Sequence, residues 1–531
     1  MYDILIKNGK LIDGSGVPWF YGDLAVKDGK IVKIKRFINE TARRIIDAQG
    51  KVVCPGFIDI HTHSDITLLV NPLAESKVRQ GITLEVGGNC GSSPAPVSSK
   101  WEEKLKREIK EDYGLKLEWR SFGEYLETME QQGISVNYAG LVGHGAIRKS
   151  VLGYDDIKPT REQFNEMGKL TAQAMQEGAF GFSTGLIYPP SSFADTDEIV
   201  FLARIVNSYG GYYATHIRDE GENLFEAVEE AIEIGKRSGV PVQLSHHKAV
   251  GKPNWGKVNK SLKLIEKARE RGIDVTCDQY PYTAAATNLS SIIPDWAHDG
   301  EIERLIERLT DCELRIKLRK IVTKKQVEKS GWSKILISSV AGKKNKHFEG
   351  KNLEEISKTL AKDPCEVAFD LIVEEKDKVE MIRFGMSEED VQQVMKHSTT
   401  MIGSDASAKA VYGILGMGKP HPRSYGAFVR VLGKYVREEG IISLEEAIKK
   451  MTGLPAWRLG LQDRGLLKVG NWADITIFDF QKVKDTATYT NPHSYAEGIF
   501  YVIVNGKIVI DEGDHTGELA GKVLRKNGYT F

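Results

Sequence analysis

The sequence contains few cysteines, and they show no pairing pattern. Five cysteines occur in 531 residues, and none of them belongs to a Cys-x-x-Cys pair. This excludes a disulfide framework and favours a reducing compartment, so we expect a cytoplasmic protein. Long apolar runs are also absent. No stretch reaches the roughly 18 residues of a membrane span, and the first residues lack the apolar core of a signal peptide.

Neither sign of charge is in excess. Lys and Arg number 73, Asp and Glu also number 73, and the formal net charge is zero. Non-specific nucleic-acid binding and adhesion to anionic membranes both require a basic excess. We therefore expect a small-molecule substrate and no nucleic-acid or membrane partner. Formation of a homo-oligomer stays open at this stage.

The two ends of the chain share a strand pattern. The segments IKNGKLI (6–12), VKDGKIV (26–32) and IVNGKIV (503–509) place Asn-Gly or Asp-Gly between alternating apolar residues, which predicts hairpins. The segment ADITIFDF (473–480) predicts a further strand. We therefore expect residues 1–54 and 463–531 to form one small β-sandwich domain.

The long middle, residues 55–462, alternates short apolar runs with helical patterns. In NLFEAVEEAIEIGKRSG, for example, apolar residues recur with a helical period from Leu224 until Gly239 ends the helix. Eight strands each followed by helix predict an α/β fold, the (β/α)8 or TIM barrel. The predicted strands are 57–63, 82–88, 136–143, 180–186, 212–217, 242–247, 274–280 and 399–405. Residues 286–395 are too long for one crossover, so we expect an inserted subdomain after strand seven that covers the barrel mouth.

The segment GFIDIHTHSD (56–65) ends an apolar strand with two histidines. Side chains two apart on a strand point to the same side, so His61 and His63 form a metal-ligand arrangement that suits zinc. Taken alone, the pair could equally be two surface histidines near a turn. The ends of the other predicted strands decide between these interpretations, because active sites of this barrel lie at the carboxyl ends of its strands.

Those strand ends carry more potential metal ligands. They are Cys90 after strand two, His216 on strand five, His246, His247 and Lys248 on strand six, and Asp405 on strand eight. Such a concentration predicts one shared metal site. Individual alternatives remain: Cys90 could be a small buried apolar residue, His247 could replace His246, and Asp405 could cap the following segment. His144, after strand three, is either near the substrate or structural.

These residues resemble a known family. PGFIDIHTHSD looks like the first-strand signature of the amidohydrolase superfamily. With GNCGSSPAP, THIRDEG, LSHHK, GSDA and HPRSYGAF, residues 1 to about 510 resemble its branch of N-acyl-D-amino-acid deacylases, or D-aminoacylases. Relatives that act on cyclic amides usually bridge two metals with a carboxylated lysine on strand four, and FGFSTGLIY offers no lysine. The stretch between Asp405 and His421 is longer here than the family pattern suggests.

The resemblance implies a zinc enzyme with a β-sandwich beside a (β/α)8 barrel. Cys90, His216 and His246 would hold a tight zinc, and His61 and His63 a second, weaker one that Cys90 bridges. Asp405 would be the catalytic acid and base and a further metal contact. The implied substrate-binding residues are Lys248, Tyr282, Arg423 and Tyr188, and Tyr280 is an alternative to Tyr282.

The implied reaction is hydrolysis of the amide bond of N-acyl-D-amino acids. The alternatives are a dipeptidase that cleaves an L-aminoacyl group from a C-terminal D-amino acid, a cyclic-amide hydrolase of the hydantoinase or dihydroorotase type, and a non-enzymatic metal-binding homologue. An acidic partner for a free amine, Asp219 or Glu220, would favour the dipeptidase. We expect these two residues to be a solvated pair at a helix start.

Overall fold

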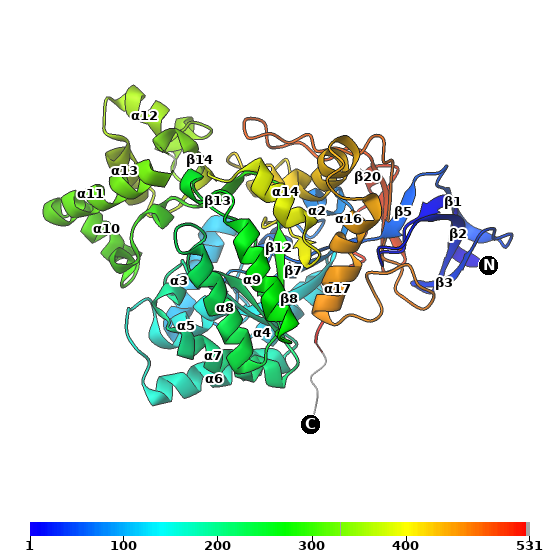
Figure 1. The fold of residues 1–531 in the computed structure, drawn as a ribbon, viewed down its shortest axis with the longest axis horizontal. Helices are drawn as coiled ribbons and strands as arrows, with labels where there is room; N and C mark the ends of the chain where they lie inside the picture. The colour runs from blue at the N-terminus through cyan, green and yellow to red at the C-terminus, as the bar shows by residue number, and fades with distance from the viewer. Residues whose placement is uncertain (330, 527–531) are drawn as a thin grey trace.

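A computed structural model describes residues 1–329 and 331–526, and its centre is a barrel of eight parallel strands (Figure 1). The strands pair in the order β16-β12-β11-β10-β9-β8-β7-β6. A parallel bridge between Thr62 and Ala406 joins the two edge strands just beyond their ends. The strands are β6 (Phe57–Asp59), β7 (Ile82–Gly87), β8 (Asn137–Gly143), β9 (Gly181–Gly185), β10 (Tyr212–His216), β11 (Val242–Leu244), β12 (Val275–Gln279) and β16 (Thr400–Ile402).

Amphipathic helices cover the outside of the barrel. In α8 the buried side chains include Leu224, Val228 and Ala231, and Gly239 ends the helix in the left-handed conformation (φ +77°), as predicted. The helices around the barrel are α1 (Thr67–Val70), α2 (Glu75–Val78), α3 (Ser99–Tyr113), α4 (Phe122–Gln132), α5 (His144–Leu152), α6 (Arg161–Gln176), α7 (Thr196–Ser208), α8 (Leu224–Ser238), α9 (Val258–Glu270), α14 (Glu388–Lys396), α15 (Arg423–Arg430), α16 (Leu444–Met451) and α17 (Gly453–Leu459).

Both ends of the chain build a second, nine-stranded sheet beside the barrel. Apolar residues from the N-terminal strands, such as Ile4 and Leu24, share one core with Ile475 and Ile503 from the C-terminal strands. The barrel with a separate β domain built from both termini confirms the predicted fold class, and the exact domain limits stay a prediction. The strands are β1 (Tyr2–Leu11), β2 (Phe20–Lys27), β3 (Lys30–Lys35), β4 (Ala42–Asp47), β5 (Val52–Pro55), β17 (Ile475–Phe478), β18 (Ile499–Val504), β19 (Lys507–Asp511) and β20 (Asp514–His515).

Two of the three predicted hairpins form, and the third is wrong. Asp28-Gly29 connects β2 to β3, and Asn505-Gly506 connects β18 to β19. Asn8, by contrast, lies inside the continuous strand β1, where the register shifts between Ile6 and Gly9. Its φ of +56° makes a β-bulge there. A hairpin turn and this β-bulge both require a residue with a left-handed backbone, so the dipeptide Asn-Gly is compatible with either structure.

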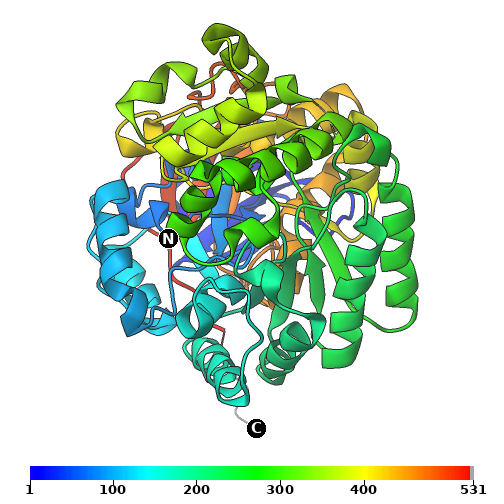
Figure 2. The same cartoon turned by 90° about the vertical axis from the view of Figure 1, so that its left-hand side faces the viewer.

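The insertion lies between β12 and β16 and has its own apolar core. Its sheet has the order β13-β15-β14, and α14, which follows it, packs on the barrel helix α9. In Figure 1 the insertion lies at the opposite end of the molecule from the β domain, and in Figure 2 it lies in front of part of the barrel. Its elements are β13 (Ala284–Asn288), α10 (Ile302–Thr310), α11 (Cys312–Lys329), β14 (Ile335–Val340), α12 (Leu353–Leu360), α13 (Pro364–Glu374) and β15 (Val379–Phe384).

Contacts from the insertion reach the loops at the carboxyl ends of the barrel strands. The Thr287 hydroxyl on β13 lies 3.1 Å from the Tyr188 hydroxyl, and the Arg423 guanidinium lies 3.4 Å from the Ala286 carbonyl oxygen. The insertion therefore forms one wall of the barrel mouth. Across residues 1–329 and 331–526, we find no helix with the length and apolar character that a membrane crossing requires.

Candidate metal centre

Six side chains from five strand ends converge at the carboxyl end of the barrel. They are His61 and His63 after β6, Cys90 after β7, His216 at the end of β10, His246 after β11, and Asp405 after β16. They form two groups that share Cys90, and within each group the potential ligand atoms all lie within 4.8 Å of one another. The groups are His61, His63, Cys90 and Asp405, and Cys90, His216 and His246.

The donor atoms fit a zinc ion. The Cys90 Sγ lies 3.4 Å from His61 Nε2 and 3.5 Å from His246 Nε2, and the rings of His216 and His246 have centroids 4.3 Å apart. Both ring nitrogens of His216 are buried without a hydrogen-bond partner. Because buried polar atoms are normally satisfied, this lack of a protein partner fits a histidine that binds a metal. Imidazole nitrogen and thiolate sulfur are the ligands that zinc prefers.

Charge at the site favours the thiolate that a metal requires. Burial alone would raise the pKa of Cys90, but the imidazoles of His61 and His246 lower that pKa well below its usual range. A thiolate is the form that binds metals. The alternative in which Cys90 is an inert apolar residue therefore has no support from its surroundings.

Three of the six residues have a left-handed backbone. The φ angles of Cys90, His246 and Asp405 are +51°, +35° and +51°. A non-glycine residue in this region costs about 1–3 kcal/mol, which the surrounding structure must hold in place, and such residues cluster at functional sites. Backbone hydrogen bonds do so here: His246 N donates to Asp278 Oδ1 at 2.8 Å, and Asp405 N donates to the His61 carbonyl at 2.8 Å.

The two adjacent histidines after β11 point in different directions. His246 faces Cys90, whereas His247 Nε2 lies 2.8 Å from the Ser261 hydroxyl on α9. Burial lowers the pKa of His247 to about 4. The structure therefore places His246 in the metal group and His247 outside it.

Asp405 lies between the metal group and Arg423. Its Oδ1 lies 3.1 Å from His63 Nε2, and its Oδ2 accepts a hydrogen bond from the Arg423 guanidinium at 2.7 Å. Burial would raise the pKa of Asp405, but Arg423 and the imidazole of His246 hold that pKa well below its ordinary range. The carboxylate is therefore ionised and can accept a proton.

Glu220 is a component of the site, although the sequence favoured a solvated position for it. We expected a solvated residue, but only 12% of its side chain is exposed. Its Oε1 lies 2.9 Å from His246 Nδ1 and accepts a hydrogen bond from Lys248 Nζ at 2.5 Å. The expected solvent exposure was wrong because the loop after β10 folds over the carboxyl end of β11, where Glu220 contacts His246 and Lys248. The available signal was the four-residue spacing from His216 to Glu220.

Asp278, on β12, is a second such component. Its Oδ1 lies 3.1 Å from His61 Nδ1, and its Oδ2 accepts a hydrogen bond from the Gln243 amide at 2.6 Å. A carboxylate that holds one nitrogen of a histidine orients the other toward a metal. The signal in the sequence was an aspartate inside the otherwise apolar strand VTCDQ.

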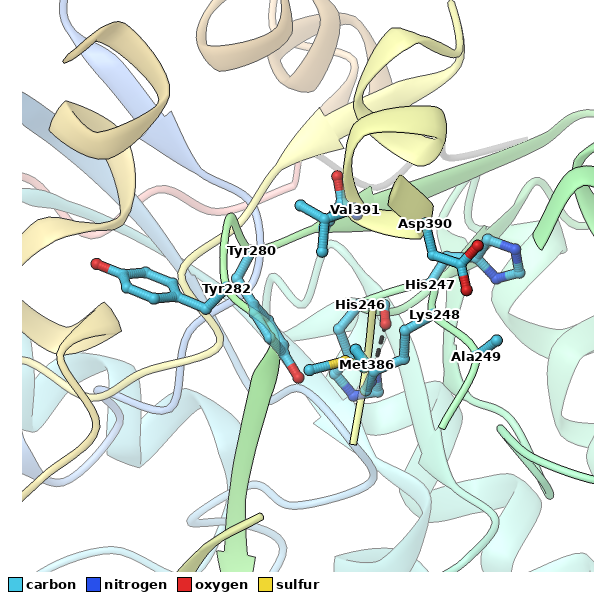
Figure 3. A pocket seen from close by; sticks show the side chains of 10 residues that line it. His246, His247, Lys248, Ala249, Tyr280, Tyr282, Met386, Asp390 and Val391 are labelled. Atoms are coloured by element: carbon cyan, nitrogen blue, oxygen red, sulfur yellow. Dashed lines mark hydrogen bonds between the residues drawn. The ribbon is translucent and has the colours of Figure 1, made fainter. Parts of the chain in front are cut away.

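The predicted substrate-binding residues lie at different distances from the six potential metal ligands. The Tyr188 ring has its centroid 5.1 Å from that of His216, and Lys248 is next to His246. The Tyr280 ring is 6.4 Å from the His246 ring, whereas the Tyr282 hydroxyl lies 3.5 Å from the Pro422 carbonyl oxygen. Figure 3 shows the Tyr282 ring pointing away from His246. The geometry thus favours the alternative, Tyr280, for the tyrosine role.

A small cavity of about 10 Å³ is lined by residues that include Lys248, Tyr280, Met386 and Val391 (Figure 3). It has room for about one water-sized group. His144 lies outside this region. It is fully buried, and its two ring nitrogens lie 2.9 Å from the Ser191 hydroxyl and 2.8 Å from Glu198 Oε1. These contacts favour the structural alternative for His144.

The chain is similar to known proteins over nearly its whole length. The model of the amidohydrolase family matches residues 44–510. D-aminoacylase of Alcaligenes xylosoxydans xylosoxydans is 38% identical over 525 residues, which cover 99% of this chain and 98% of the relative. N-acyl-D-glutamate deacylase of the same organism is 34% identical over 527 residues, with coverage of 99% and 97%.

Two solved structures share the whole architecture. One is a D-aminoacylase with a binuclear metal centre, in which one metal activates and the second attenuates; it has a TM-score of 0.83 and 36% identity and covers 99% of this chain and 100% of its own. The other is N-acyl-D-glutamate deacylase from Bordetella bronchiseptica, complexed with zinc and a phosphonate that mimics the tetrahedral intermediate. It has a TM-score of 0.83 and 33% identity and covers 99% of each chain.

Proposed function

The chain belongs to the amidohydrolase family, and from this membership we propose that it is a zinc-dependent N-acyl-D-amino-acid deacylase. It hydrolyses the amide bond of N-acyl-D-amino acids and releases a carboxylate and a free D-amino acid. The observation that carries this proposal is the Cys90, His216 and His246 group next to a second group that contains Asp405. The full-length relatives and the zinc-bound neighbour that act on linear N-acyl-D-amino acids support it.

The residues of the metal centre have separate proposed roles. Cys90, His216 and His246 would hold a tight zinc, and His61, His63, Cys90 and Asp405 would hold a second, weaker one. Zinc bound there would supply Lewis acidity, which polarises the acyl carbonyl and makes water a stronger nucleophile. In the described strand β9 no lysine is present, which disfavours the lysine-bridged centre of cyclic-amide hydrolases.

Asp405 moves the proton. As the oxygen of the attacking water bonds to the acyl carbon, Asp405 accepts the proton that this water loses. When the carbon–nitrogen bond breaks, Asp405 returns that proton to the leaving nitrogen, so the amine departs neutral. Arg423 keeps the carboxylate ionised before the reaction, which supports its role as the initial base.

Lys248, Arg423, Tyr188 and a tyrosine of the segment QYPYT are the proposed substrate contacts, and the geometry favours Tyr280 over Tyr282. Lys248 and Arg423 each already pair with a carboxylate, Glu220 and Asp405 respectively. The α-carboxylate of the substrate would therefore bind next to two ion pairs, Lys248 with Glu220 and Arg423 with Asp405. The planar fork of Arg423 suits this carboxylate.

The dipeptidase alternative has one specific observation in its favour. Glu220 is a buried carboxylate at the site, which could bind the free amine of an L-aminoacyl group. This carboxylate already contacts His246 and forms an ion pair with Lys248, however. We therefore rank this function second.

The first experiment measures amino-acid release from N-acetyl-D- and N-acetyl-L-amino acids, with methionine and glutamate in both forms, by zinc-loaded protein. We expect release from the D-forms only. Asp405→Asn should keep its zinc and lose about 10²–10⁴-fold in kcat. Release from neither form would refute the deacylase and lead to tests with L,D-dipeptides and cyclic amides. Near-normal activity of Asp405→Asn would refute its role as base.

We also propose a cytoplasmic location. All five cysteines lie in the described residues, and each is a free thiol there. Free thiols persist in reducing compartments, which supports this location.

A further inference from the structure

Lys77, on α2, is a cation whose side chain is completely buried at the edges of the barrel sheet. Its Nζ donates hydrogen bonds to Asp59 Oδ2 at 2.8 Å, to Ser404 Oγ at 2.8 Å and to the Ala406 carbonyl oxygen at 2.9 Å. Asp59 is the last residue of β6, and Ser404 and Ala406 follow β16. An ammonium group has three protons, so these contacts use all of them. The proposed mechanism gives this cation no task.

The ammonium of Lys77 is charged and has carboxylate partners. Burial would lower its pKa, but the carboxylates of Asp59 and Glu85 raise that pKa above its usual value. Glu85, on β7, has its Oε2 3.3 Å from Lys77 Nζ. Separating such a buried pair would leave uncompensated charges, which is costly. Lys77 therefore keeps a defined position relative to β6 and β7.

Two of the groups that Lys77 holds belong to the immediate neighbours of Asp405. Ser404 precedes Asp405 and also donates its backbone N–H to Asp59 Oδ1 at 2.8 Å. Ala406 follows Asp405, and its N–H donates to Ser404 Oγ at 3.2 Å. Asp405 itself has a φ of +51°, a conformation that its surroundings must hold in place. One cation thus fixes the chain on both sides of this residue.

The Asp405 carboxylate has little freedom of position. Its Oδ1 lies 3.1 Å from His63 Nε2, and its Oδ2 accepts a hydrogen bond from Arg423 at 2.7 Å. The backbone N–H of His63 also donates to the Ala406 carbonyl oxygen at 3.3 Å, so the acceptor of Lys77 links this turn to His63. Because catalysis depends on exact placement, a displacement of about 1 Å can cost about 10²-fold in rate.

We propose that Lys77 is a positioning residue: its ammonium fixes the turn 404–406 and thereby places the Asp405 carboxylate for proton transfer. This inference rests on the proposed deacylase function, in which Asp405 moves the proton. None of the three hydrogen bonds of Lys77 reaches the group that would hold the tight zinc, which is Cys90, His216 and His246. Loss of the ammonium should therefore lower turnover and leave the tight zinc in place.

The experiment measures kcat and KM for N-acetyl-D-methionine, together with zinc content and thermal unfolding, for Lys77→Met in the wild-type and in the Asp405→Asn background. Lys450→Met is the matched control. Lys450 is also completely buried, and its Nζ donates to the carbonyl oxygens of His397 and Thr400 at the other end of β16. Ser404→Ala, which removes one acceptor of Lys77 and leaves no charge unpaired, is the second variant.

We expect Lys77→Met to retain its tight zinc and to lose about 10–100-fold in kcat. In the Asp405→Asn background the same substitution should cause no further loss, because it acts through a carboxylate that is already absent. Ser404→Ala should show the same dependence on background with a smaller loss. Lys450→Met should unfold at a lower temperature and keep its kcat.

Two results would overturn the inference. One is a wild-type kcat in folded Lys77→Met. The other is an equal fall of kcat in both backgrounds, which would mean that Lys77 supports the fold as a whole. If Lys77→Met does not fold, the same two results for Ser404→Ala decide against the inference.

The inference and the proposed function fail in distinguishable ways. If the wild-type protein hydrolyses N-acetyl-D-methionine and Asp405→Asn does not, an unchanged kcat in Lys77→Met refutes only the role of Lys77. No hydrolysis of any N-acyl-D-amino acid by zinc-loaded wild-type protein refutes the function itself.

Discussion

At the residue scale, the site depends on carboxylates that hold the metal ligands from behind. Glu220 contacts His246 Nδ1, and Asp278 contacts His61 Nδ1. When a carboxylate holds the proton on Nδ1, Nε2 keeps its lone pair for a metal. Each of these histidines has its Nε2 directed at Cys90. The two carboxylates therefore orient the ligands, and Lys248 Nζ lies 2.7 Å from the same Nδ1 of His246.

Glu220→Gln tests this arrangement. The amide keeps the shape of the side chain but loses the charge that favours the Nδ1 proton of His246 and the ammonium of Lys248. We expect zinc affinity to fall about 10–100-fold, as for other carboxylates behind metal ligands. Competition with a chelating dye measures it without reference to turnover.

Asp219→Asn is the matched control, because Asp219 is the neighbouring carboxylate and its side chain contacts Gly221 and Asn223 instead. Glu220→Asp, which keeps the charge, should recover part of the affinity. An unchanged zinc dissociation constant in Glu220→Gln would show that the contact to His246 does not position the ligand.

At the element scale, the insertion contains a carboxylate that destabilises it at neutral pH. Burial raises the pKa of Asp377, between α13 and β15, to about 6, and its Oδ1 is buried without a partner. Because this pKa lies above the unfolded value of about 3.8–3.9, the folded state binds the proton more tightly. The penalty is therefore absent below about pH 4 and complete above about pH 6.

Asp377→Asn should remove that penalty. Asn tolerates the left-handed backbone of this position, where φ is +64°. We expect the variant to unfold with a free energy about 1–3 kcal/mol higher than the wild type at pH 7.5, and with about a third of that difference near pH 4.5. Urea unfolding at both values measures it. Glu354→Gln, at an exposed carboxylate on α12, is the control, and an effect of Asp377→Asn that does not vary with pH would contradict the explanation.

For the secondary-structure elements, the sequence predicted the barrel strands more accurately than the turns that follow them. All eight barrel strands occur where apolar runs predicted them, because burial on both faces makes such runs distinct. Most end before the predicted limit, because the chain turns at residues such as Cys90, His246 and Asp405, whose left-handed backbone no pattern announces. The Asn8-Gly9 bulge was misread for a related reason: the dipeptide specifies a backbone conformation and not the strand pairing that follows.

The site was predictable to the extent that its residues sit at strand ends. His61 and His246 could be placed together because parallel strands of one barrel end at the same face. The contacts of Glu220 with Lys248 and of Thr287 with Tyr188 could not, because they depend on how loops and the insertion fold across the mouth. Such contacts join segments whose spacing in the sequence carries no periodic signal.

At the scale of the whole molecule, the metal centre should tie together the two edges of the barrel sheet. Its residues follow β6 and β7 at one edge and β16 at the other, and His216 and His246 follow β10 and β11 between them. The insertion, by contrast, has a separate apolar core that contains none of these residues. A ligand that binds only the folded state stabilises it by about 2.7 kcal/mol at 100 times its dissociation constant.

Removal of zinc should therefore loosen the barrel mouth and leave the insertion unaffected. In chelator-treated protein we expect faster amide hydrogen exchange in residues 61–65, 88–92, 245–248 and 403–406, with little change in α13 and β15. The reason is that these strand-end turns hold strained backbones whose side chains lose their common partner. Mass spectrometry of exchanged peptides, with zinc restored as the control, measures this pattern. A uniform rise across barrel and insertion would show that the metal stabilises the whole chain as one cooperative unit.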